Sequence, residues 1–191
     1  MSFMRFILFF VIVIGALIGA GFGVVALFDS TTFAQSGAVK REGMKTFRDA
    51  KLGLSFSYPD DWKEERLPFG MVRFTQEEDE TPVMITQVSK QEVERSLAEY
   101  TKETMTEIAE SSEQDGFTFI LEESIETTLG GREAFRISAF MERDERVMRS
   151  VQIWSVAAGR VYSFTFSAQL TVFDNAVQMF ENVLESVEIK D

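Results

Sequence analysis

Carboxylates supply most of the chemistry that this chain could perform. They gather at Asp60-Asp61, in the run Glu77-Glu78-Asp79-Glu80, at Glu122, Glu123 and Glu126, and at Glu142, Asp144 and Glu145. Paired carboxylates can hydrolyse glycosides, and clustered carboxylate oxygens can hold Ca²⁺. None of these groups has the spacing of a known catalytic or calcium-binding motif. A carboxylate hydrolase and a calcium or small-ligand sensor therefore stand only as alternative functions.

The two runs of adjacent acids have simpler structural interpretations. Asp60-Asp61 follows Tyr58-Pro59, and Asp is favoured in turns because its side chain bonds the nearby backbone. The second run, Glu77, Glu78, Asp79 and Glu80, lies between two strand patterns and is expected at a solvated hairpin tip. Because a turn presents several of these charges together, the tip is the candidate docking point for a basic protein partner.

The composition removes several classes of function. The 191 residues include no histidine and no cysteine, which excludes thiol catalysis, disulfides and the usual ligands of zinc. No cofactor or metal site is expected. The net charge of −12, with 31 acidic against 19 basic side chains, repels nucleic-acid phosphates. We therefore predict neither an enzyme nor a nucleic-acid-binding protein.

An uncharged apolar run after the short N-terminus (residues 1–5) predicts a transmembrane helix over residues 6–28. A cleaved signal peptide ending near Ala34 is the alternative, and basic residues after the span leave the orientation open. We favour a signal anchor with the long C-terminal part on the extracytoplasmic side, because long domains translocate largely regardless of charge. Gly15, Gly19 and Gly23 form a small-residue face through which two such helices could pair.

The rest of the chain divides into a flexible linker over residues 29–44 and a folded domain over residues 45–191. Alternating apolar residues predict strands at 54–58, 71–74, 83–88, 119–127, 134–142, 147–156 and 161–168. A capping box at Ser96 and Glu99 begins a helix that runs to about Ser111. A second helix over 173–187 has the clearest apolar face, and a short strand follows it. These elements predict an α+β fold with two main helices and a largely antiparallel sheet.

The signature Leu54-Ser-Phe-Ser-Tyr58-Pro59-Asp-Asp-Trp62 resembles the opening of the PsbP-like family. The resemblance continues through Gly131, a long strand carrying Trp154, a strand carrying Tyr162, and the final helix, so it covers residues 45–191. It implies an α/β/α sandwich without enzymatic activity, used as an accessory or docking subunit with varied partners. The missing lipobox cysteine and the different linker speak against a photosynthetic role.

The sequence thus predicts a membrane-tethered, extracytoplasmic accessory or protein-binding module. Its partner is expected to be a protein, reached first through acidic surface.

Overall fold

A computed structural model describes residues 43–76, 82–90, 94–115, 117–143 and 146–190. The chain divides into two compact units, Met1–Glu42 and Gly43–Asp191. All described residues belong to the second unit. The expected membrane span at 6–28, most of the linker and the glycines Gly15, Gly19 and Gly23 lie outside the described residues. Within the described part, no helix is both long and apolar enough to span a bilayer.

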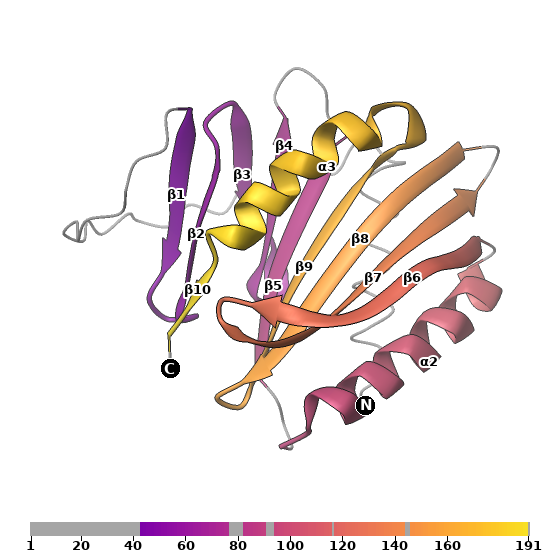
Figure 1. The fold of residues 1–191 in the computed structure, drawn as a ribbon, viewed down its shortest axis with the longest axis horizontal. Helices are drawn as coiled ribbons and strands as arrows, with labels where there is room; N and C mark the ends of the chain where they lie inside the picture. The colour runs from indigo at the N-terminus through magenta and orange to yellow at the C-terminus, as the bar shows by residue number, and fades with distance from the viewer. Residues whose placement is uncertain (1–42, 77–81, 91–93, 116, 144–145, 191) are drawn as a thin grey trace. The chain divides into compact units, whose positions relative to one another are not determined.

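Ten strands, two α-helices and one 3₁₀ turn make up the described unit (Figure 1). The first half contains β1 (Met44–Asp49), β2 (Leu54–Pro59), β3 (Trp62–Arg66), η1 (Pro68–Gly70), β4 (Met71–Gln76), β5 (Val83–Lys90) and α2 (Leu97–Asp115). The second half contains β6 (Thr118–Leu129), β7 (Arg132–Arg143), β8 (Arg146–Ala157), β9 (Arg160–Gln169), α3 (Leu170–Glu185) and β10 (Glu188–Ile189).

The strands form two antiparallel sheets. The larger sheet has seven strands in the order β3-β4-β5-β9-β8-β7-β6, and the smaller has three in the order β1-β2-β10. Strand β10 reaches β2 because Gly53 lets the backbone approach: Lys190 N–H donates to the Gly53 carbonyl at 2.8 Å. A Cβ at Gly53 would collide with the Lys190 carbonyl, and its φ of +65° is a conformation that glycine adopts most easily.

The small sheet and α3 cover one face of the large sheet, and their aromatic side chains form the main core. Phe56 of β2 lies 5.5 Å from Phe74 of β4 and 5.3 Å from Phe164 of β9, measured between ring centroids. On α3, Phe180 stacks on Phe166 at 5.2 Å. Edge-to-face and offset-stacked rings add to the free energy of burial. This face therefore carries the main hydrophobic core of the unit.

Helix α2 covers the opposite face of the large sheet. Side chains alternate between the two faces of a strand, so Arg149, which contacts Asp174 of α3, and Trp154 point to opposite sides of β8. The Trp154 Nε1–H donates to the Thr101 hydroxyl of α2 at 2.9 Å. The helix begins with the expected capping box, in which the Ser96 hydroxyl accepts from Glu99 N–H at 3.2 Å and the Glu99 carboxylate accepts from Ser96 N–H at 2.9 Å. The Ser96 N–H and the Ser96 hydroxyl, which both donate to the Glu99 carboxylate, lower the pKa of Glu99.

The α+β class, the two helices and the antiparallel arrangement expected from the sequence are confirmed. Two strands were not expected. Strand β1 has one buried apolar residue, Phe47, and β3 has only Trp62, so neither shows the alternation that predicts a strand. The single expected sheet is in fact two. The large sheet is made continuous by the pairing of β5 with β9, which are far apart in sequence and which join the strands β3-β4-β5 to the strands β9-β8-β7-β6.

Trp62 offers a test of the core. Its side chain is 5% exposed and belongs to the aromatic core. We expect Trp62→Ala to lower the free energy of unfolding by about 3–5 kcal/mol, because large cavities in packed cores cost that much. Urea unfolding of residues 43–191 would measure it, with Trp62→Phe as a milder control. A loss under about 1 kcal/mol would contradict the assigned burial.

Phe69 offers a test of backbone strain. It lies in η1 with φ of 62° and ψ of 29°, and its side chain is 66% exposed. A bulky residue is disfavoured in this left-handed conformation by about 1–2 kcal/mol, whereas Asn tolerates it. We expect Phe69→Asn to raise stability by about 0.5–1 kcal/mol in the same urea measurement. Ala158 is the other non-glycine residue with positive φ among the described residues, and Ala158→Asn should change stability in the same direction.

Candidate functional site

The residues of the family-like signature lie in the core and in a turn. Tyr58, Trp62, Trp154 and Tyr162 are all buried, and Tyr162 donates its hydroxyl hydrogen to the Leu52 carbonyl at 3.2 Å. Burial, assisted by the neighbouring Glu64 carboxylate, raises the pKa of Tyr58 to about 12. Pro59 ends β2, and Gly131 has φ of 77° in the β6–β7 turn. The four aromatic side chains are therefore structural, whereas Pro59 and Gly131 shape turns, where Pro59 is half-buried and Gly131 is exposed.

The acidic candidates are dispersed. Asp60 and Asp61 form the turn between β2 and β3, as expected. The expected docking residues Glu77, Glu78, Asp79 and Glu80 lie outside the described residues. In the part of the chain that is described, no group of three or more acidic side chains is arranged to hold a metal ion.

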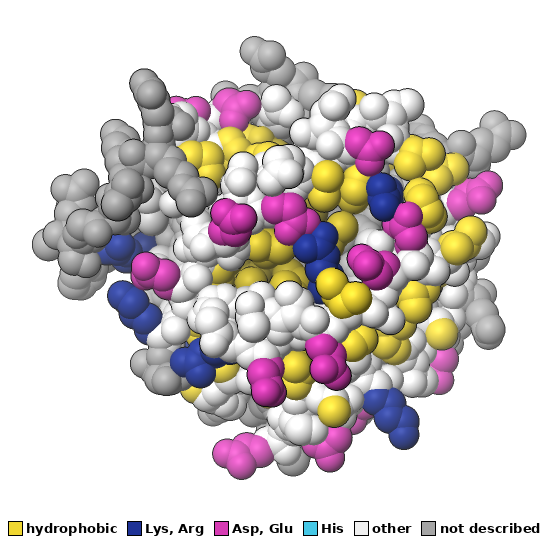
Figure 2. All heavy atoms as spheres, in the orientation of Figure 1, with side chains coloured by type: hydrophobic (Ala, Val, Ile, Leu, Met, Phe, Trp, Pro, Cys, Tyr) yellow, Lys and Arg dark blue, Asp and Glu magenta, His cyan; other side chains and the backbone are white. Residues whose placement is uncertain are grey.

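The surface that stands out is the α3-side face of β6 and β7, which we call the open strip. Its residues are Ile120, Glu122, Glu123, Ile125, Arg136, Ser138 and Phe140, placed by the register of the two strands and by contacts with α3. Neither α3 nor the small sheet covers it, so Ile120 is 52% and Ile125 is 41% exposed. Figure 2 shows hydrophobic side chains surfacing between α3 and β6, crossed by basic and acidic ones.

A bulge in β6 creates this apolar surface. Ile120 and Ile125 are five residues apart, so a regular strand would place them on opposite faces. The register shifts between Leu121 and Glu123, which inserts Glu122 as an extra residue. As a result Ile120 faces Phe140 and Ile125 faces Arg136 on β7, and both isoleucines share the α3 side. Bulges re-aim side chains in this way.

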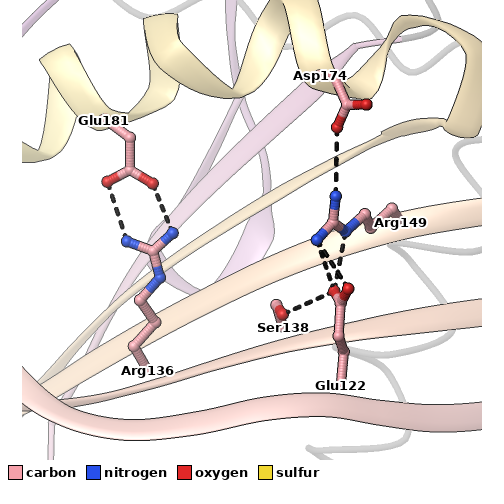
Figure 3. Close-up of polar contacts among 6 residues, drawn as sticks. All are labelled: Glu122, Arg136, Ser138, Arg149, Asp174 and Glu181. Atoms are coloured by element: carbon pink, nitrogen blue, oxygen red, sulfur yellow. Dashed lines mark hydrogen bonds and ion pairs between the residues drawn. The ribbon is translucent and has the colours of Figure 1, made fainter.

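Arg149 of β8 ties the strip to α3 (Figure 3). Its Nε and Nη2 donate to the two carboxylate oxygens of Glu122, each at 2.9 Å, and its Nη1 donates to Asp174 Oδ1 at 3.2 Å. The guanidinium lies between two rings, 4.8 Å from the Phe173 centroid and 5.5 Å from that of Phe140. The Ser138 hydroxyl donates to Glu122 at 3.0 Å. This cluster fixes the position of Glu122.

Arg136 makes a second bridge to the helix, as Figure 3 also shows. It holds Glu181 through both terminal nitrogens, with Nη1 donating at 2.9 Å. Its Nε is buried and has no partner among the described residues. Both arginines are therefore already engaged by acids of this chain, and neither is free to bind an outside anion.

The strip and the adjoining flank of α3 carry a surplus of negative charge. Four carboxylates, those of Glu122, Glu123, Asp174 and Glu181, face two guanidinium groups. Asp174 is 82% exposed and Glu123 is also exposed, so both can still bind cations. Chemically, the site combines apolar contact with an acidic border, as an interaction surface does.

Sequence reasoning found two of the four acids of this site but not the site itself. Glu122 and Glu123 were noted, whereas Ile120, Ile125, Arg136 and Arg149 were not. The sequence did contain one signal. Ile120 and Ile125 are an odd number of residues apart in one long strand pattern, so a regular strand cannot place both on the same face, and a bulge between them is indicated. The pairing of α3 with β7 and β8 could not be derived, because it joins residues distant in sequence.

Comparison with known proteins identifies the family. The PsbP family model matches residues 42–189, so the chain belongs to the PsbP family. Members of this family are protein-binding or accessory modules, and the fold is generally non-catalytic. No curated protein matches the chain.

Several solved structures share the fold. The cyanobacterial PsbP of Synechocystis sp. PCC 6803 aligns with TM-score 0.65 and 15% identity, covering 82% of this chain and 98% of that one. The Saccharomyces cerevisiae Ran-binding protein Mog1p aligns with TM-score 0.55 and 11% identity, covering 78% and 96%. At these identities the similarity concerns the fold alone.

A double-mutant cycle would test the cluster that positions Glu122. We expect Arg149→Met and Glu122→Gln to show a coupling of about 1 kcal/mol in urea unfolding, because their two-pronged bond is partly shielded from water. The Arg149–Asp174 pair should couple by only about 0.2 kcal/mol, since Asp174 is mostly exposed. Equal couplings would contradict the assigned geometry.

Proposed function

We propose that this chain is a non-catalytic, membrane-tethered module that binds another protein on the extracytoplasmic side of its membrane. The observation that carries the proposal is the open strip, where Ile120 and Ile125 are exposed beside an acidic border in a family of protein-binding modules. Apolar side chains that a bulge gathers on one exposed face support a binding role, because contiguous exposed apolar surface marks interaction sites.

The tether is proposed from the sequence. Residues 6–28 contain no charged side chain and are long enough to cross a bilayer as one helix. A helix of this kind anchors far more strongly than a peripheral contact. The extracytoplasmic placement is proposed because a long domain comes after the span, and long domains translocate largely regardless of charge.

The acidic run Glu77-Glu78-Asp79-Glu80 is the proposed encounter site for the partner, as distinct from the strip. A net charge of −12 favours basic partners and accelerates their approach. Charges at the border of an interface act mainly on the association rate, whereas buried apolar contacts act on dissociation. The two surfaces would therefore contribute to different kinetic steps.

Co-purification from membranes would test the function. The full-length protein should remain with membranes after high-salt and alkaline washes, and affinity purification should retain a specific protein partner.

Ile120→Ser with Ile125→Ser should remove that partner, because the strip supplies the apolar contact. Leu121→Ser is the matched control: Leu121 is 42% exposed on the same strand but pairs with Ala139 on the opposite face. A chain of residues 1–44 serves as the second control bait. If the full-length protein retains no protein that this shorter bait does not also retain, the proposal is contradicted.

Kinetics with the purified partner would test the encounter site. Replacing residues 77–80 with Ser should slow association and leave dissociation and folding unchanged, since exposed charges add little to stability. The wild-type association rate should fall as salt rises from about 50 to about 300 mM, because counterions screen the attraction. Rates independent of salt would reject the electrostatic step.

A further inference from the structure

We propose that the open strip receives one amphipathic helix of the partner, carrying an apolar stripe bordered by Lys or Arg. This inference rests on the proposed protein-binding function and specifies the partner's chemistry at the strip. Three features of the described surface support a helix in particular: its width, its charge, and the state of the neighbouring sheet edge.

The width of the strip matches one helix. Strands lie about 4.8 Å apart, so the two strands β6 and β7 offer a seat of about 10 Å, the diameter of a helix. Helix α3 packs over β8 and β9 on the same face. A helix centred on β6 and β7 would lie two strands away, about 10 Å from α3, which is the usual distance between packed helices. The partner helix would therefore continue the layer that α3 begins.

The charge of the border selects a basic helix. Asp174 and Glu181 lie seven residues apart on α3, two turns along the side that faces the strip, and Glu123 lies on the opposite border. Arg136 and Arg149 are already paired with carboxylates of this chain, so the net charge that remains at the border of the strip is negative. An incoming helix with Lys or Arg along its flanks would meet carboxylates on both sides while its apolar stripe covered Ile120 and Ile125.

The edge of the sheet is unsuited to the main alternative, an added strand. Strand β6 is the edge strand, and an extended peptide could in principle pair with its free backbone groups. The bulge between Leu121 and Glu123 breaks the regular ladder, and Glu122, Glu123 and Glu126 add charge along it. Bulges and charges are the features that prevent pairing at sheet edges. The face beside the edge is the more favourable seat.

A defined peptide would test this. The full-length protein, with isoleucine methyl groups labelled for NMR, is placed in nanodiscs of zwitterionic lipid. The probe is an 18-residue peptide of Leu, Lys and Ala with Leu at helical spacing and Lys on both flanks. We expect saturable shifts of the Ile120 and Ile125 methyl resonances and none at buried Ile137 or Ile108. Empty nanodiscs account for peptide bound to lipid.

Variants and sister peptides make the result specific. Ile120→Ser with Ile125→Ser should weaken binding about tenfold or more, while Leu121→Ser changes it less than about twofold. Glu123→Gln with Asp174→Asn should also weaken it, and a Leu-Glu-Ala peptide should not bind. Unchanged melting temperatures would show that the variants fold.

Each contrary outcome has a defined meaning. Equal losses of peptide affinity in the Ile120 and Ile125 variants and in Leu121→Ser would contradict binding at the open strip. Resonance shifts confined to other faces of the domain would contradict it as well. Tighter binding by a peptide of alternating Leu and Lys, with shifts in β6 amide resonances, would establish edge pairing instead. If a partner co-purifies and resists the Ile120 and Ile125 substitutions, the binding function stands and the helix proposal fails. If no partner co-purifies, the function itself fails.

Discussion

The architecture of this domain depends on how much of a wide sheet its other elements can cover. Seven strands at about 4.8 Å spacing span about 29 Å, whereas one helix covers about 10 Å of that width. On the α3 side, the small sheet covers the β4 end and α3 covers the middle, and the aromatic rings between them seal that part of the core. The width that remains is β6 and β7. The open strip is thus exposed because the seven-strand sheet is wider than the layer formed by α3 and the small sheet.

A sheet face that no other element covers is exposed to solvent, so its apolar surface must be shielded by polar and charged side chains. The side chains around the strip provide part of this shielding. Arg136 and Arg149 reach from the sheet to α3, and their aliphatic stems, together with the Arg149 guanidinium stacked on Phe173, shield part of the apolar surface. Ser138 and Glu122 complete a polar network beside them. Ile120 and Ile125 remain outside this protection, which makes them the informative exceptions on this face.

Sequence patterns predicted the elements that have a clear inside and outside. Strand β2 alternates, and α3 repeats its apolar residues at helical spacing, because each buries one face against a core. Strands β1 and β3 bury a single side chain each, so their conformation comes from pairing with β2 and β4 and leaves almost no local pattern. The division into two sheets and the position of α3 depend on contacts between distant segments. For the site, the sequence indicated Glu122 and Glu123, and the register of β6 on β7 places them beside the isoleucines. Asp174 and Glu181 join the site through contacts of α3 with Arg149 and Arg136, which the sequence did not indicate.

The same extra residue accounts for two properties of β6 that otherwise look unrelated. Inserting Glu122 turns Ile125 to the side of Ile120, which makes the face apolar, and it also interrupts the hydrogen-bond ladder, which protects the edge from added strands. Removing the bulge would therefore place the two isoleucines on opposite faces and would also restore a continuous edge open to pairing. If β6 needed only protection from added strands, a charged residue at position 120 or 125 would provide it without gathering apolar side chains on one face. The gathering of these apolar side chains on one face is the observation that supports the proposed interface.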